Sequence, residues 1–138
     1  MNLRQITART AAAAIVLGGA LVGAAPAQAA SSCWNGGFTV RNGDYTYQAY
    51  KCHNRSGATV WAATKDTEVQ NSWTGAMYSS TSWFACKIDD GQYNGNNTHP
   101  YRWLLTQADN GHWGWMKDTD ISDETNSVPN CSLYWYGW

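Results

Sequence analysis

Two patterns of hydrophobic and polar positions divide the chain. Residues 11–25 form one uninterrupted apolar run, whereas later residues alternate apolar and polar positions over short stretches separated by Gly, Asn and Asp. Alternation with a period of two is typical of strands that bury one face. No later stretch shows a convincing helical period. The pattern therefore predicts an all-β domain preceded by a separate apolar segment.

The first strong hairpin is predicted at residues 38–50, FTVRNGDYTYQAY. Asn42-Gly43 is typical of a type I′ turn, because both central residues of that turn need a positive φ. A turn at these two residues places Phe38 opposite Tyr47. Apolar and polar side chains then separate onto two faces, as a half-buried hairpin requires. The predicted apolar face carries Phe38, Val40, Tyr45, Tyr47 and Ala49.

A second hairpin is predicted at residues 101–116, around Asn110-Gly111. This turn places Leu105 opposite Met116. Both faces of the hairpin are substantially apolar, so one face is expected in the core. The other is expected either beneath another strand or open as an aromatic surface.

Weak strands are predicted around residues 59–61 and 76–79, the first closed by the polar triplet Lys65-Asp66-Thr67, and a third, better strand is predicted at residues 82–89. In the third, Phe84, Cys86 and Ile88 are expected to share one face. Residues 90–100 form a Gly/Asn-rich loop, and loops often carry function. Several short strands separated by turns predict a small barrel or sandwich.

The start of the chain has the features of a secretory signal peptide. Arg4 and Arg9 precede the apolar run, and Ala27-Gln28-Ala29 follows it. Charge, apolar run and A-x-A site in this order indicate cleavage after Ala29. A membrane anchor is the alternative, but the run is shorter than the roughly twenty residues that span a bilayer. We expect a secreted domain of residues 30–138 with no membrane contact after cleavage.

The mature chain suits one domain and, we expect, a monomer. It carries seven basic and ten acidic residues, a net charge of −3. Nucleic-acid binding depends on neutralising phosphates, so this balance argues against it. It argues equally against binding an anionic membrane surface.

Four cysteines in a short exported chain predict a disulfide framework. Continuing the register of the first hairpin places Cys33 opposite Cys52, at a separation that a disulfide can bridge. This leaves Cys86 to pair with Cys131. A zinc site is not expected, because no two cysteines have the C-x₂₋₄-C spacing.

No catalytic residues, metal or cofactor are predicted. The chain has no G-x-S-x-G or H-E-x-x-H motif. Its acidic patch lacks the glycine and terminal glutamate of a calcium loop, so a solvated turn is the better interpretation. The patch consists of Asp118, Asp120, Asp123 and Glu124.

The excess of aromatic residues is the most informative feature of the composition. All nineteen rings lie in the mature chain, nine of them tryptophans. Trp and Tyr suit binding surfaces, and an exposed apolar patch usually marks an interaction site. Arg102 would add a donor or a cation–π contact. The expected ligand-binding residues are Tyr101, Arg102, Trp103, Trp113 and Trp115.

Residues 58–131 resemble a secreted bacterial SH3-like domain. The residues that carry the resemblance include Ser82-Trp83-Phe84-Ala85-Cys86, Tyr101-Arg102-Trp103, Gly114-Trp115-Met116 and Ile121. The resemblance implies a small SH3-like barrel, to which the disulfide-stapled hairpin is an N-terminal addition. Thr59-Val60-Trp61 replaces the family's Arg-rich first strand, so the ligand preference does not transfer directly.

Two functions are expected from these observations. The first is an extracellular, non-catalytic binding module for a cell-wall peptide, glycan or exported protein. The second is a secreted inhibitor of an amylase or protease, since Tyr101-Arg102-Trp103 is also similar to the aromatic–Arg–aromatic triplet of small α-amylase inhibitors. A small secreted hydrolase is the third alternative, although the chain lacks a catalytic constellation.

Overall fold

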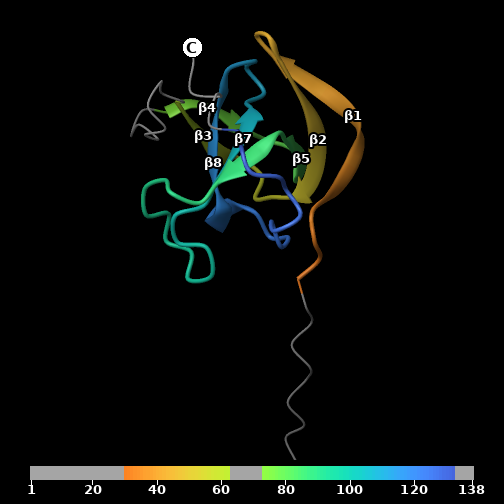
Figure 1. Ribbon diagram of the computed structural model, residues 1–138. Coiled ribbons are helices and arrows are strands. Elements are labelled where there is room, and N and C mark those ends of the chain that lie inside the picture. The colour runs from red at the N-terminus through yellow and green to blue at the C-terminus, as the bar shows by residue number, and fades with distance from the viewer. Residues whose placement is uncertain (1–29, 63–72, 133–138) are drawn as a thin grey trace, which may run out of the picture.

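The computed structural model describes residues 30–62 and 73–132 (Figure 1). The predicted signal peptide, the Lys65-Asp66-Thr67 turn and residues 133–138 of the aromatic tail lie outside the described residues. The described part is all-β, as predicted, with one 3₁₀ turn at Asp118–Asp120. The strands are β1 (Trp34–Asn42), β2 (Tyr45–His53), β3 (Ala58–Ala62), β4 (Trp73–Met77), β5 (Thr81–Phe84), β6 (Cys86–Ile88), β7 (Trp103–Gln107) and β8 (Trp113–Lys117).

The strands form two antiparallel sheets, in the orders β1-β2-β5 and β4-β3-β8-β7-β6. Among the described residues, the sheets do not close into the barrel that was predicted. Ala85 separates β5 from β6, so the chain passes there from the smaller sheet to the larger one. The predicted strand at 82–89 is therefore two strands, and Phe84 packs in a different cluster from Cys86 and Ile88.

The first hairpin forms where predicted, but its register differs by two residues near the turn. Val40, not Phe38, lies opposite Tyr47. The two-residue loop is Gly43-Asp44 rather than Asn42-Gly43, with Gly43 at a φ of 57°. Because the shift is even, side chains keep their predicted faces.

A bulge in β1 then restores the predicted register. Three β1 residues, 36–38, span the distance that Ala49 alone spans in β2. Gly37 adopts a φ of 76° there, and its N–H donates to Asn35 Oδ1 at 2.8 Å. Beyond the bulge, Trp34 lies opposite Lys51, so the adjacent cysteines meet as predicted.

Both predicted disulfides are confirmed. The Cα–Cα distances are 4.5 Å for Cys33–Cys52 and 4.9 Å for Cys86–Cys131. They close loops of 19 and 45 residues. On the loop-entropy model these cross-links stabilise the fold by about 3 and 4 kcal/mol.

The second hairpin has a three-residue loop, 109–111, instead of the predicted two-residue loop. The Ala108 N–H donates to the His112 carbonyl oxygen at 2.8 Å, and Gly111 has a φ of 87°. A positive φ at the third loop residue is typical of this loop class. Leu105 therefore lies opposite Trp115, not Met116.

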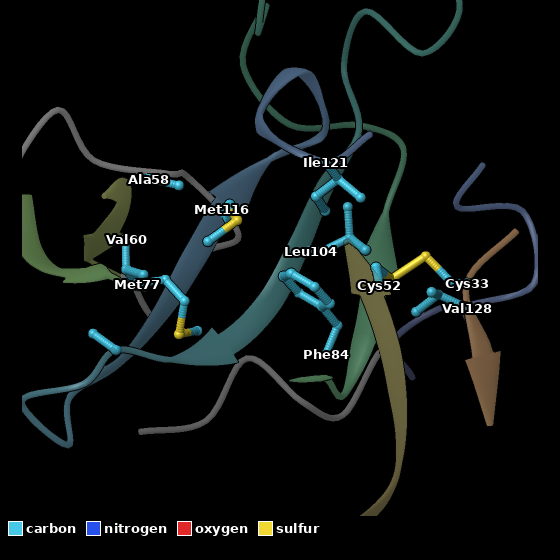
Figure 2. Packing of buried hydrophobic residues seen from close by; sticks show 11 residues of the cluster. Cys33, Cys52, Ala58, Val60, Met77, Phe84, Leu104, Met116, Ile121 and Val128 are labelled. Carbon is cyan, nitrogen blue, oxygen red and sulfur yellow. A yellow bond between two sulfur atoms is a disulfide. The ribbon is translucent and has the colours of Figure 1, made fainter. Parts of the chain in front are cut away.

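Alternate residues of β7 and β8 face two different hydrophobic clusters. The inner core lies between the sheets, where Phe84 from β5 meets Leu104 and Met116 from the larger sheet (Figure 2). The Cys33–Cys52 disulfide packs at one end of this core. We call the face of each sheet that points away from the inner core its outer face. A second group of buried side chains, here called the outer cluster, consists of Ala85, Cys86, Ile88, Trp103, Leu105 and Trp115.

Candidate functional site

The structure does not bring the five predicted ligand-binding residues together on one exposed surface. Tyr101 is 51% exposed and Trp113 is half-buried. Trp103 and Trp115 are 2% and 1% exposed, and Arg102 is also buried. The rings separate further, since Tyr101 pairs with Tyr93, whereas Trp113 pairs with Trp83.

Arg102 is part of a buried polar network instead of a ligand surface. Its Nε donates to Asp89 Oδ1 at 2.5 Å, and its Nη1 donates to Thr125 Oγ1 at 2.9 Å. The Thr125 hydroxyl donates in turn to Asp118 Oδ1 at 2.6 Å. Because Arg102 and Trp103 are both buried, the Tyr101-Arg102-Trp103 triplet is not presented as an inhibitor-like surface.

The network shifts the acidity of its members in different directions. Burial raises the pKa of Asp118, opposed by the hydrogen bond from Thr125 and by nearby positive charge. Burial also acts to raise the pKa of Glu124, but hydrogen bonds from His99 and the Asn126 N–H together lower it below its ordinary value.

Lys87 is buried at the edge of the same network. Its Nζ donates to the carbonyl oxygens of Val128 and Asn126. Burial, reinforced by the charge of Arg102, lowers the pKa of Lys87. These contacts connect Lys87 on β6 and Arg102, just before β7, to the 118–128 segment. The network therefore holds this segment against the larger sheet.

The acidic patch does not form a cation site in the structure. Within residues 30–62 and 73–132, no group of three or more His, Cys, Asp or Glu side chains is arranged to hold a metal ion. Its members have separate partners, since Asp120 pairs with Arg55 and Asp123 pairs with His53. The interpretation as a solvated turn needs one correction, because Asp118 and Asp123 are buried.

A different set of rings forms a continuous feature on the outer face. Trp34, Lys51 and Trp83 are direct cross-strand partners on β1, β2 and β5. Directly opposed residues project from the same face of a sheet. The Trp113 ring extends this set, with its centroid 5.3 Å from that of Trp83 in an edge-to-face contact. We call Trp34, Lys51, Trp83 and Trp113 the aromatic row.

One end of the aromatic row packs against the outer cluster, and the other end is exposed. Trp83 and Trp113 pack against the outer cluster, which contains the buried Trp103 and Trp115. At the other end Trp34 is 40% exposed. Neighbouring strands lie about 4.8 Å apart, so the two tryptophans on either side of Lys51 stand about 10 Å apart.

Two further side chains border the row on the β1–β2 hairpin. Lys51 Nζ lies 5.9 Å from the centroid of the Phe38 ring. The His53 ring lies 5.2 Å from that of Trp34, and its Nδ1 is 2.9 Å from a carboxylate oxygen of the buried Asp123. Disulfide, bulge and carboxylate thus fix the positions of the exposed rings.

The sequence interpretation missed Trp34, Lys51 and Trp83 as site residues. The sequence did contain a signal for Trp34 and Lys51, because the register that pairs Cys33 with Cys52 also places these two residues opposite each other. The addition of Trp83 required the pairing of β2 with β5, which joins strands 28 or more residues apart and leaves no local pattern.

Comparisons with protein-family models, with curated proteins and with solved structures found no match for this chain. In the described residues, no helix is long and apolar enough to cross a membrane. The two disulfides are typical of proteins in oxidising compartments.

Proposed function

We propose that the protein is exported from the cell and acts there as a non-catalytic module that binds a cell-wall glycan. The observation that carries this proposal is the aromatic row, in which Trp34, Lys51 and Trp83 are held in register across three strands and Trp113 continues the line. Export is supported by the predicted signal peptide and by the two disulfides.

A line of rings on a sheet face suits a chain-like ligand. Each ring offers a flat apolar surface with a polar edge, and each sugar of a glycan offers an apolar ring face bordered by hydroxyl groups. Contacts repeated along a line let several weak stacking interactions add up. The rings are already fixed by strand pairing and packing, so binding costs little ordering entropy.

The predicted site residues take two roles in this proposal. Trp113 contacts the ligand, whereas Trp103 and Trp115 support it from the outer cluster. We also propose that residues 58–131 are SH3-like. The support is that β3, β8 and β7 are adjacent antiparallel strands and that Gly114-Trp115-Met116 lies on β8 as the resemblance implies.

Co-sedimentation with insoluble polysaccharides tests the function. Purified protein is incubated with peptidoglycan, cellulose, chitin and calcium pectate gel, and the retained fraction is measured against protein concentration. Trp34→Ala should weaken retention at least about tenfold, because Trp34 is the most exposed ring of the row and truncating a tryptophan that contacts the ligand costs about 2 kcal/mol. Trp34 is already 40% exposed, so the fold should tolerate the change.

Tyr93→Ala is the matched control, because Tyr93 is 64% exposed and its ring contacts Tyr101 instead of the row. The control should bind like the wild type, and both variants should unfold at the wild-type temperature. Retention on none of the four polysaccharides, or equal loss in both variants, overturns the proposal. Retention only on peptidoglycan that still carries its peptides, and not on the stripped glycan strands, would assign the site to a peptide instead.

A further inference from the structure

We infer that the glycan held on the outer face is an acidic one, whose sugars carry carboxylate groups. The inference rests on the proposed function and names the ligand class of the same site. Two lysines, Lys51 and Lys117, stand among the outer-face rings with no carboxylate partner in the described residues. A glycan that supplies carboxylates beside its stacking faces would satisfy both kinds of group at once.

Lys51 lies in the middle of the aromatic row. Trp34 is its cross-strand partner on one side and Trp83 on the other, and its ammonium group lies over the Phe38 ring. The contact with Phe38 positions this charge beside the row. An anion that arrives along the row therefore meets a positioned charge, and this interaction is stronger near apolar surface than in bulk water.

Lys117 repeats this arrangement on the larger sheet. Its Nζ lies 5.2 Å from the centroid of the Trp61 ring and 5.6 Å from that of the Trp103 ring. Trp103 is its cross-strand partner, so Lys117 projects from the same face as the outer cluster. The outer faces of the two sheets thus present one lysine each, Lys51 and Lys117, and each ammonium group lies over an aromatic ring.

Lys51 and Lys117 differ from the other described Lys and Arg side chains in having only ring contacts. Arg55 and Arg102 pair with carboxylates, whereas Arg41 and Lys87 donate to backbone carbonyl oxygens. Next to the Trp34 end of the row, the Asp123 carboxylate accepts a hydrogen bond from the His53 N–H and contacts the His53 ring. The domain has a net charge of −3 from its sequence, yet its ring-bearing face offers cations. Charge complementarity therefore favours an acidic ligand over a neutral one.

Affinity electrophoresis with a matched pair of polysaccharides tests the inference. The protein is run through gels that contain polygalacturonate or the same polymer fully methyl-esterified, which has no carboxylate charge. We expect strong retardation by polygalacturonate and at least about tenfold weaker binding to the ester, as for the loss of a hydrogen bond to a charged group. Lys51→Met should weaken binding to polygalacturonate to a similar extent, and Lys51→Met/Lys117→Met further.

Arg41→Met is the charge-matched control. Arg41 is an exposed cation at the tip of the same hairpin, where its Nε donates to the Gly43 carbonyl oxygen, and its loss should leave retardation unchanged. Equal binding to acid and ester overturns the acidic-ligand inference but leaves the glycan-binding function standing. Equal weakening by Arg41→Met and Lys51→Met also overturns it, because that result shows a general charge effect. Binding to neither polymer, nor to any polysaccharide in the co-sedimentation panel, is the separate failure of the proposed function.

Discussion

At the scale of single residues, the structure explains why particular side chains occupy positions that composition alone leaves open. Gly114 is the clearest case. A Cβ atom added there would collide with the carbonyl oxygen of Trp61 and with the side chain of Val60. The glycine of the Gly114-Trp115-Met116 motif therefore permits close approach of β3 to β8. The next two residues then alternate between the outer cluster and the inner core.

Gly114→Ala should lower the free energy of unfolding by about 1–3 kcal/mol, the usual cost of forcing an extra methyl group into a packed site. Urea denaturation followed by tryptophan fluorescence measures the effect. Thr39→Ala, at an exposed position of β1, should stay within about 0.5 kcal/mol of the wild type. A Gly114→Ala protein as stable as this control would show that β3 and β8 are not in close contact.

Glu124 gives a prediction about pH. Its pKa is lowered in the folded protein, so the fold gains stability from its charge above the ordinary value of 4.5, and this stability is lost as the pH falls below it. Asp118 acts with the opposite sign, because its pKa is raised. Glu124→Gln should therefore reduce the loss of stability between about pH 5 and pH 3, and denaturation midpoints across this range measure it. Parallel midpoint curves for wild type and variant would contradict the role given to the His99–Glu124 contact.

At the scale of elements, both strong hairpins and both disulfides could be predicted, because turn residues and alternation are local signals. The registers of the strands in these hairpins could not be predicted. The first loop keeps two residues but lies at Gly43-Asp44, and the second has three residues, 109–111; neither difference is visible in an alternating pattern. The Cys33–Cys52 pair was nevertheless correct, because the β1 bulge cancels the two-residue shift at the turn.

The kink at Ala85 is another feature that periodicity could not reveal. The segment 82–89 alternates without interruption in the sequence, yet the chain leaves one sheet and enters the other at its middle. The backbone N–H of Ala85 donates to the carbonyl oxygen of Leu105 at 2.8 Å, so the change of sheet occurs without losing that hydrogen bond. Such a change depends on partners distant in the sequence.

At the scale of the whole molecule, the aromatic excess has a physical explanation. Aliphatic and sulfur-containing side chains fill most of the inner core, whereas several tryptophans lie on the outer face, in or against the outer cluster. The sequence predicted an exposed aromatic surface on the second hairpin, but Trp103 and Trp115 of that hairpin are buried in the outer cluster. The exposed end of the aromatic row lies on the first hairpin instead. The order of strands in the sheet brings β1, β2 and β5 together, and the sequence does not show this order.

The most direct test of the aromatic row is to observe its indole groups while a glycan binds. Protein labelled with ¹⁵N is titrated with soluble oligosaccharides of the polysaccharide that retains it in the co-sedimentation assay, and the indole N–H signals are followed by NMR after assignment by single substitutions. We expect concentration-dependent shifts for Trp34, Trp83 and Trp113, because these three rings form the aromatic row. No shift of these three indole signals at saturating fragment would contradict the proposed binding site.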